Sequence, residues 1–196
     1  MGNKCANCQK EIPLRYLLVE ILCGMVSYLL FPDILTYHTL SLYLFYFNIF
    51  VVFLCLMVID FIHQILPDVL NIYLGLLFFI YAFIFLSWKS SLVGLLIGLL
   101  VPLLVTWAYY FLRGKIGLGG GDIKLFAILG IYLGPLGIIH NIFASCLLGS
   151  VIGGLLIFLK KMDPQRPIPF GPFIIAVAIF QIFSPHQSEL LFSLFR

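Results

Sequence analysis

Residues 41–59 read SLYLFYFNIFVVFLCLMVI, an uncharged stretch that ends directly before Asp60. A helix needs about 20 mostly apolar residues to cross the hydrocarbon core of a bilayer, so this stretch predicts a transmembrane helix. Its apolar residues form a continuous run, whereas a strand of a membrane β-barrel alternates apolar and polar residues. The fold is therefore expected to be built from helices in a membrane.

The composition of the whole chain agrees with this expectation. Of its 196 residues 63% are hydrophobic and only 10% are charged, whereas about 25% are charged in a typical soluble domain. A soluble domain of this size leaves too much surface in water to hide so many apolar side chains. The formal net charge of +3 is small and scattered, unlike the basic patch of a nucleic-acid-binding protein. The composition excludes an ordinary soluble enzyme, a disordered tail and a nucleic-acid binder.

Charges and clusters of proline and glycine divide the chain into apolar segments. The pattern predicts an all-α, polytopic membrane helix bundle with about seven transmembrane helices. These are expected at residues 16–31, 41–59, 70–88, 92–112, 123–139, 141–159 and 168–184. Gly134–Gly137 could mark a bend between the fifth and sixth segments instead of the end of a span. Glycines spaced four apart, such as Gly94 with Gly98 and Gly130 with Gly134, predict close helix packing.

The distribution of basic residues predicts the orientation. If the N-terminus lies in the cytoplasm, nine of the eleven Lys and Arg residues fall on the cytoplasmic side, and only Lys89 and Arg196 fall outside. Basic residues are enriched in cytoplasmic loops, so the bundle is expected to be N-in and C-out. Residues 1–15 then form a short cytoplasmic segment, and residues 16–196 form the transmembrane domain.

Three aspartates lie at predicted helix ends on the cytoplasmic side: Asp60, Asp68 and Asp122. An ionisable group at a membrane boundary is costly when it loses water and is a functional candidate for that reason. Alternatively, Asp68 and Asp122 could simply cap the helices that follow them. A metal site made of His63 with Asp60 and Asp68 is weakly indicated, because one His and two acids form an incomplete ligand set.

Asp60 and Asp122 could act as a pair of catalytic carboxylates. In such a pair an ionised acid takes a proton from water while a protonated acid polarises the carbonyl of the peptide bond. A helix dipole favours negative charge at the N-terminus and disfavours it at the C-terminus. Asp122 is therefore hypothesised to be the base and Asp60 the acid. The three glycines before Asp122 give the backbone conformational freedom there.

Several segments, in this order along the chain, resemble the bacterial type 4 prepilin peptidases, polytopic aspartyl proteases with a Gly-x-Gly-Asp signature. Val58-Ile59-Asp60, Leu66-Pro67-Asp68 and Gly119-Gly120-Gly121-Asp122-Ile123-Lys124 carry the resemblance. It extends to Pro169-Phe170-Gly171-Pro172 and to Cys5-Ala6-Asn7-Cys8. Gly-Gly-Gly-Asp alone is a weak signal, whereas the ordered set is specific.

The resemblance implies an aspartic endopeptidase of the bacterial inner membrane. It would remove the basic leader from type IV prepilins or pseudopilins, cutting after Gly on the cytoplasmic side, with Asp60 and Asp122 as catalytic residues. Its products would serve type IV pili, type II secretion or DNA uptake. Supporting or substrate-binding candidates are Asp68, Gly119, Gly120, Gly121 and Lys124. The peptidase reaction would need no cofactor. The expected partners are the prepilin substrate and the lipid bilayer, and no nucleic acid is expected among them.

Many members of that family also N-methylate the new N-terminus with S-adenosylmethionine. Such bifunctional members usually carry two Cys-x-x-Cys pairs, but the chain has only Cys5 and Cys8 in such a motif. Structural zinc normally takes four ligands, so the zinc site is incomplete. The chain resembles an N-terminally short form of the family, and its methyltransferase activity stays open. Two alternatives of other classes are a small ion-coupled carrier and a non-catalytic subunit of a pilus or secretion assembly.

Overall fold

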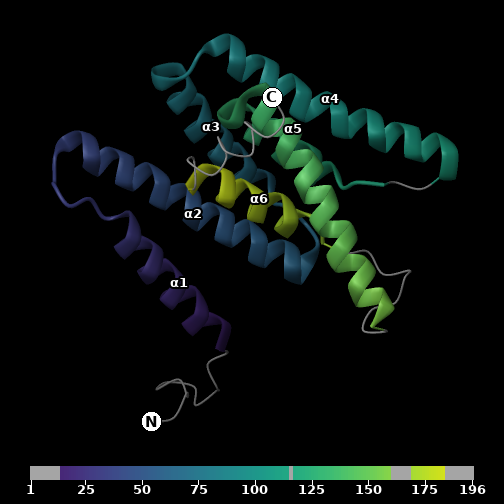
Figure 1. Cartoon of the computed structure of the whole chain (residues 1–196), viewed down its shortest axis with the longest axis horizontal. Helices are drawn as coiled ribbons and strands as arrows, with labels where there is room; N and C mark the ends of the chain where they lie inside the picture. Colours follow the sequence, from purple (N-terminus) through teal and green to yellow (C-terminus); the bar gives the residue numbers. More distant parts are fainter. Residues whose placement is uncertain (1–13, 115–116, 160–168, 184–196) are drawn as a thin grey trace. The chain divides into compact units, whose positions relative to one another are not determined.

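The computed structural model describes residues 14–114, 117–159 and 169–183. Throughout these segments the regular structure is α-helical, which confirms the all-α fold class. Figure 1 shows the helices in chain order: α1 (Leu14–Leu30), α2 (Tyr37–His63), α3 (Asp68–Phe85), α4 (Trp88–Arg113), α5 (Gly120–Phe158) and α6 (Gly171–Phe183).

Four of these helices, α2 to α5, are long and apolar enough to cross a membrane. Within the described residues α1 and α6 are shorter apolar helices. Helices satisfy their own backbone hydrogen bonds, which is why long apolar segments adopt this form in lipid. The chain is thus a multi-pass membrane protein. The count of seven spans and the N-in, C-out orientation stay predictions.

The helix boundaries differ from the expected ones in two places. The expected fifth and sixth spans correspond to two helical segments, together labelled α5, that meet at a kink where Gly134 has non-helical backbone angles (φ 69°, ψ −174°) before Pro135. Proline cannot donate a backbone hydrogen bond but fits the first turn of a helix, so the helix resumes directly after the bend. The structure therefore has a kink at Gly134 between two helical segments, and whether these are one span or two stays a prediction. In addition, α2 continues to His63, so Asp60 lies inside its last turn instead of ending the helix.

The chain divides into two compact units with a boundary between Leu54 and Cys55, inside α2. In the first unit, α1 contacts α2 through the Ser27 and Tyr43 hydroxyl groups, whose oxygens are 2.7 Å apart. The ring of Phe31 meets Tyr43 edge-on, with centroids 5.6 Å apart. The second unit holds Asp60, Asp68 and Asp122 and is the one that builds the candidate site.

Helix α5 is the centre of the second unit, where it packs against α3, α4 and α6 (Figure 1). Its closest approach to α4 is at Gly94 and Gly130, where a Cβ added to either residue would overlap the other's carbonyl oxygen. Gly98 comes similarly close to the Phe126 carbonyl oxygen. Only residues without a side chain allow two helix backbones to approach this closely, so the expected close packing at these glycines is confirmed.

A buried polar network joins α5 to α6. Asn141 is fully buried, and its Nδ2 donates a hydrogen bond to Gln181 Oε1 at 2.9 Å. Gln181 Nε2 in turn donates to the Gly137 carbonyl oxygen at 3.0 Å. Buried polar groups are costly unless they are paired, so this network fixes the register between the two helices. That register also sets where α6 begins, at Gly171.

Candidate active site

Asp60 is buried at the C-terminal end of α2. Its side chain is 5% exposed, and its Oδ2 atom has no hydrogen-bond partner among the described residues. The backbone of Gly171, the first residue of α6, lies against this carboxylate. A Cβ added at Gly171 would be 2.7 Å from Oδ2, closer than real Cβ atoms come, so the absence of a side chain at 171 makes room for Asp60.

Asp122 lies in the first turn of α5 and is half-buried. Its carboxylate turns back toward Gly119, the N-cap residue, and interacts with the backbone there. An acidic side chain at this position of a helix commonly reaches back to the N-cap backbone. Asp122 and Asp60 are close enough for their charges to interact. The structure therefore brings the two predicted aspartates together from helices that are far apart in the sequence.

Leu66 lies in the connection between α2 and α3. Its side chain packs against Gly121 at the start of α5 and against Gly171 at the start of α6. Its buried side chain would be 2.9 Å from a Cβ at Gly121 and 3.4 Å from one at Gly171. Sequence reasoning did not assign Leu66 or Gly171 to the site. The sequence did contain one indication of their role, because both residues occur in segments that carry the family resemblance.

Asp68 and Lys124 form an ion pair across the starts of α3 and α5. Lys124 Nζ lies 2.7 Å from Asp68 Oδ1, and the two side chains are 55% and 61% exposed. Asp68 is the first residue of α3, and the preceding N-cap position is Pro67 without a side-chain cap. The carboxylate of Asp68 is thus engaged by Lys124, and the ammonium group of Lys124 is directed to Asp68.

The glycines before Asp122 differ in their surroundings. Gly119 and Gly120 are exposed, and a Cβ at Gly120 would meet nothing within 4 Å, whereas Gly121 is tight against Leu66. The backbone at 119–120 is therefore open to solvent or to a bound chain. A Cβ at Gly121 would disturb packing against Leu66, and one at Gly119 would lie 3.1 Å from Asp122 Oδ2, whereas one at Gly120 would disturb nothing.

The metal candidates receive no support from the described part of the chain. No group of three His, Cys, Asp or Glu side chains that could hold a metal occurs there. His63 is exposed, and Cys23, Cys55 and Cys146 are free thiols. Cys5 and Cys8 lie outside the described residues, so the zinc expectation at this pair stays a prediction.

The fold and the site together define a multi-pass helical membrane protein in which two aspartates from separate helices meet at helix ends. The model of the type IV leader peptidase family matches residues 47–154, just over half of the chain, and this range includes Asp60 and Asp122. The chain belongs to the type IV leader peptidase family.

Curated relatives agree with this membership. A prepilin leader peptidase/N-methyltransferase of Pseudomonas aeruginosa and one of Stutzerimonas stutzeri are each 33% identical over 178 residues, which cover 89% of this chain and 60% of each relative. A protein of the same name from Xanthomonas campestris pv. campestris is 37% identical over 127 residues, 64% of this chain and 44% of the relative. The chain thus spans about 60% of the length of the first two relatives. No solved structure matches it.

Proposed function

We propose that this chain is a membrane-embedded aspartic endopeptidase that removes the basic leader from type IV prepilins or pseudopilins. The observation that carries the proposal is that Asp60 and Asp122 lie near enough for their charges to interact, in a member of this family. Cleavage would follow Gly on the cytoplasmic side of the bacterial inner membrane. The excess of Lys and Arg on that side in the N-in, C-out arrangement supports this orientation.

The mechanism follows from two carboxylates with different surroundings. Asp122, at the start of α5, is proposed to take a proton from the attacking water, because the helix N-terminus favours its negative charge. Asp60, at the end of α2, is proposed to be the acid that polarises the scissile carbonyl. Its buried Oδ2 has no hydrogen-bond partner among the described residues, so a hydrogen bond to substrate or water would satisfy it. A pH–rate profile with two essential ionisations is expected, and one with a single ionisation would contradict the pair.

The substrate's apolar helix is proposed to lie in the bilayer against this bundle, with its leader in the cytoplasm. Proteolysis requires an extended scissile segment, and the open backbone at Gly119 and Gly120 could pair with such a segment in the manner of an added strand. Gly120→Ala tests this step, because a Cβ there touches nothing inside the protein. Reduced cleavage with normal membrane abundance is expected. Unchanged turnover would exclude this backbone from substrate binding.

The peptidase reaction needs no cofactor. The relatives' names include an N-methyltransferase, and N-methylation of the new N-terminus by this chain would need S-adenosylmethionine. Cys5 and Cys8 could supply two of the four ligands of a structural zinc. Transfer of a labelled methyl group from S-adenosylmethionine, measured separately from cleavage, decides whether the chain has this second activity. Loss of that transfer, but not of cleavage, in Cys5→Ser would assign the pair to methylation.

Two other classes of function make different predictions. An ion-coupled carrier holds its charged site near the middle of the membrane between repeats, whereas Asp60 and Asp122 lie in the last turn of α2 and the first turn of α5. A non-catalytic assembly subunit has no need for two aspartates that interact. Both classes predict that Asp→Asn variants leave prepilin processing unchanged.

Co-expression with a prepilin tests the proposal directly. We expect the native chain to release the leader, and both Asp60→Asn and Asp122→Asn to abolish release while the variant proteins still accumulate in the membrane. Asp33→Asn, an exposed aspartate in the first unit, is the matched control and is expected to cleave normally. Cleavage that survives in either dyad variant would overturn the assignment of that residue.

A further inference from the structure

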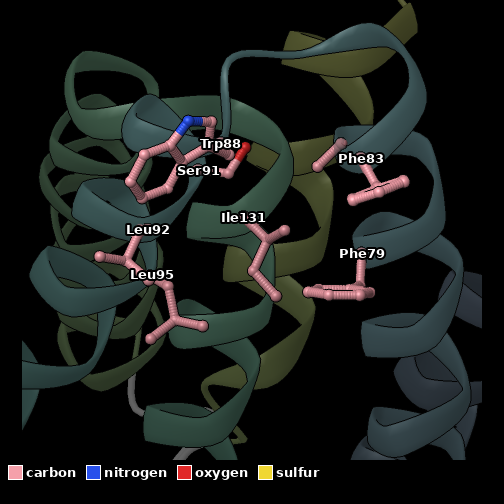
Figure 2. A pocket seen from close by; sticks show the side chains of 8 residues that line it. Phe79, Phe83, Trp88, Ser91, Leu92, Leu95 and Ile131 are labelled. Atoms are coloured by element: carbon pink, nitrogen blue, oxygen red, sulfur yellow. The ribbon is translucent and has the colours of Figure 1, made fainter.

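A cavity of about 200 Å³ lies between α3, α4 and α5, away from the aspartates. Figure 2 shows Phe79 and Phe83 of α3 on one side, Trp88, Leu92 and Leu95 of α4 on the other, and Ile131 of α5 between them. Phe79 lies 11 residues after Asp68 along α3, which is roughly 17 Å at 1.5 Å per residue. The cavity is therefore near the opposite end of α3 from the candidate active site.

The cavity is open on the outer side of the helices and closed on the side that faces the core. Phe79, Phe83 and Trp88 are each more than half exposed, whereas Ala82 and Ile131 are buried. Pockets for whole small molecules usually have roughly 300–1,000 Å³. A smaller, apolar cavity that opens sideways from a membrane span fits a segment of a long apolar chain, as in a lipid.

One polar atom in the wall lacks a partner. Ser91 also lines the cavity, is 7% exposed, and its Oγ has no hydrogen-bond partner among the described residues. A buried hydroxyl without a partner is costly. A ligand that offers an acceptor beside an apolar chain would satisfy it, and the ester carbonyl of a glycerolipid is such an acceptor.

A positively charged side chain lies at the start of α4, next to Trp88. Lys89 follows Trp88 in the first turn of α4, and its Nζ lies 5.9 Å from the centroid of the Trp88 ring. Tryptophan and lysine at the end of a span are typical of the headgroup level of a bilayer. Lys89 can therefore meet a lipid phosphate while the acyl chain lies in the cavity.

We propose that this cavity binds one phospholipid with an anionic headgroup. Its acyl chain would lie between Phe79, Phe83 and Ile131, an ester carbonyl would accept from Ser91 Oγ, and its phosphate would pair with Lys89. A purely apolar partner, such as the helix of a substrate, would satisfy the cavity walls but neither Ser91 nor Lys89. A phospholipid matches the apolar walls, Ser91 Oγ and Lys89 together, which favours it over an apolar helix.

The two tryptophans of the chain, Trp88 and Trp107, allow a direct test. Trp107→Phe leaves Trp88 as a fluorescent reporter in the cavity wall, and Trp88→Phe leaves Trp107, 19 residues further along the sequence, as the control. Each protein is reconstituted in phosphatidylcholine vesicles that contain a minor fraction of a brominated lipid. This lipid is either phosphatidylglycerol or phosphatidylcholine, and its brominated acyl chains quench tryptophan on contact.

We expect Trp88 to show about a fivefold preference for brominated phosphatidylglycerol, because one basic residue contributes on the order of 1 kcal/mol to anionic lipid binding. Trp107 is expected to be quenched equally by both lipids. Lys89→Gln should remove the headgroup preference, and Ser91→Ala should weaken quenching by both lipids. Arg113→Gln, at the other end of α4, is the charge-matched control and should leave the preference intact.

Equal quenching of Trp88 by the two lipids would overturn the proposal, as would a preference that survives Lys89→Gln. A third result would also overturn it: no lipid quenching of Trp88, but a shift of its emission when a peptide with the apolar segment of a prepilin is added. That result would assign the cavity to the substrate helix. Because no arm of the test measures cleavage, its outcome is independent of the peptidase proposal.

Discussion

The backbone of Gly171 lies directly against the buried carboxylate of Asp60, so that a Cβ at position 171 would be 2.7 Å from Oδ2. Asp60 belongs to the end of α2 and Gly171 to the start of α6. The position of one candidate catalytic carboxylate therefore depends on a residue that has no side chain and lies in a distant part of the sequence.

Gly171→Ala is expected to displace the Asp60 carboxylate and to lower prepilin cleavage by about 100-fold, since a misplacement of about 1 Å in a catalytic group can cost that much. Cleavage rates in membranes with equal amounts of enzyme provide the measurement. Gly154→Ala in α5, where a Cβ meets nothing within 4 Å, is the matched control. Equal rates for both variants would show that Gly171 does not position Asp60.

The ion pair between Asp68 and Lys124 is expected to position the starts of α3 and α5 without contributing much stability. Exposed pairs are typically worth about 0.2–1 kcal/mol. Asp68→Asn and Lys124→Gln should therefore lower cleavage by similar factors, and the reversed pair Asp68→Lys with Lys124→Asp should recover part of the rate. If Lys124→Gln alone lowered kcat and the reversed pair did not recover it, Lys124 would act on the dyad or the substrate instead.

Close packing of α4 on α5 is expected to limit the stability of the second unit. Gly130→Ala places a methyl group onto the Gly94 backbone, and a backbone carbonyl cannot move aside like a flexible side chain. We expect a loss of about 1–3 kcal/mol, typical of overpacking, measured as the midpoint of thermal or detergent-induced unfolding. Gly75→Ala, at an ordinary van der Waals distance from Ile128, should unfold like the native chain, and the same loss there would contradict the argument.

The polar network between α5 and α6 predicts a defined cost for Gln181→Leu. This change removes the closer acceptor of Asn141 Nδ2, which keeps only the Ile174 carbonyl oxygen at 3.5 Å, and it removes the donor to the Gly137 carbonyl oxygen. Hydrogen bonds between membrane helices are worth about 0.6 kcal/mol on average, and Gln181→Leu removes two of them. We expect a destabilisation of about 1–2 kcal/mol in the same unfolding assay. Phe180→Leu, an exposed neighbour on α6, is the control and should have little effect.

The sequence predicted the helices well because their cause is local. In lipid, a continuous apolar run must satisfy its own backbone hydrogen bonds, and each expected segment indeed corresponds to a helix or to part of one. The exact ends were less predictable. Whether Gly134 ends a helix or only bends it depends on how α5 packs against α4, which composition does not encode.

The candidate dyad was also visible in the sequence, because charged residues are rare in this chain and those at helix ends stand out. By itself the sequence determined the membrane helices, the aspartates at their ends and the resemblance to the family. Only the tertiary structure decided that Asp60 lies near enough to Asp122 for their charges to interact, that Lys124 pairs with Asp68, and that Leu66 and Gly171 belong to the site. The physical reason is that these contacts join distant segments, and their geometry is set by the packing of α3, α4 and α6 around α5.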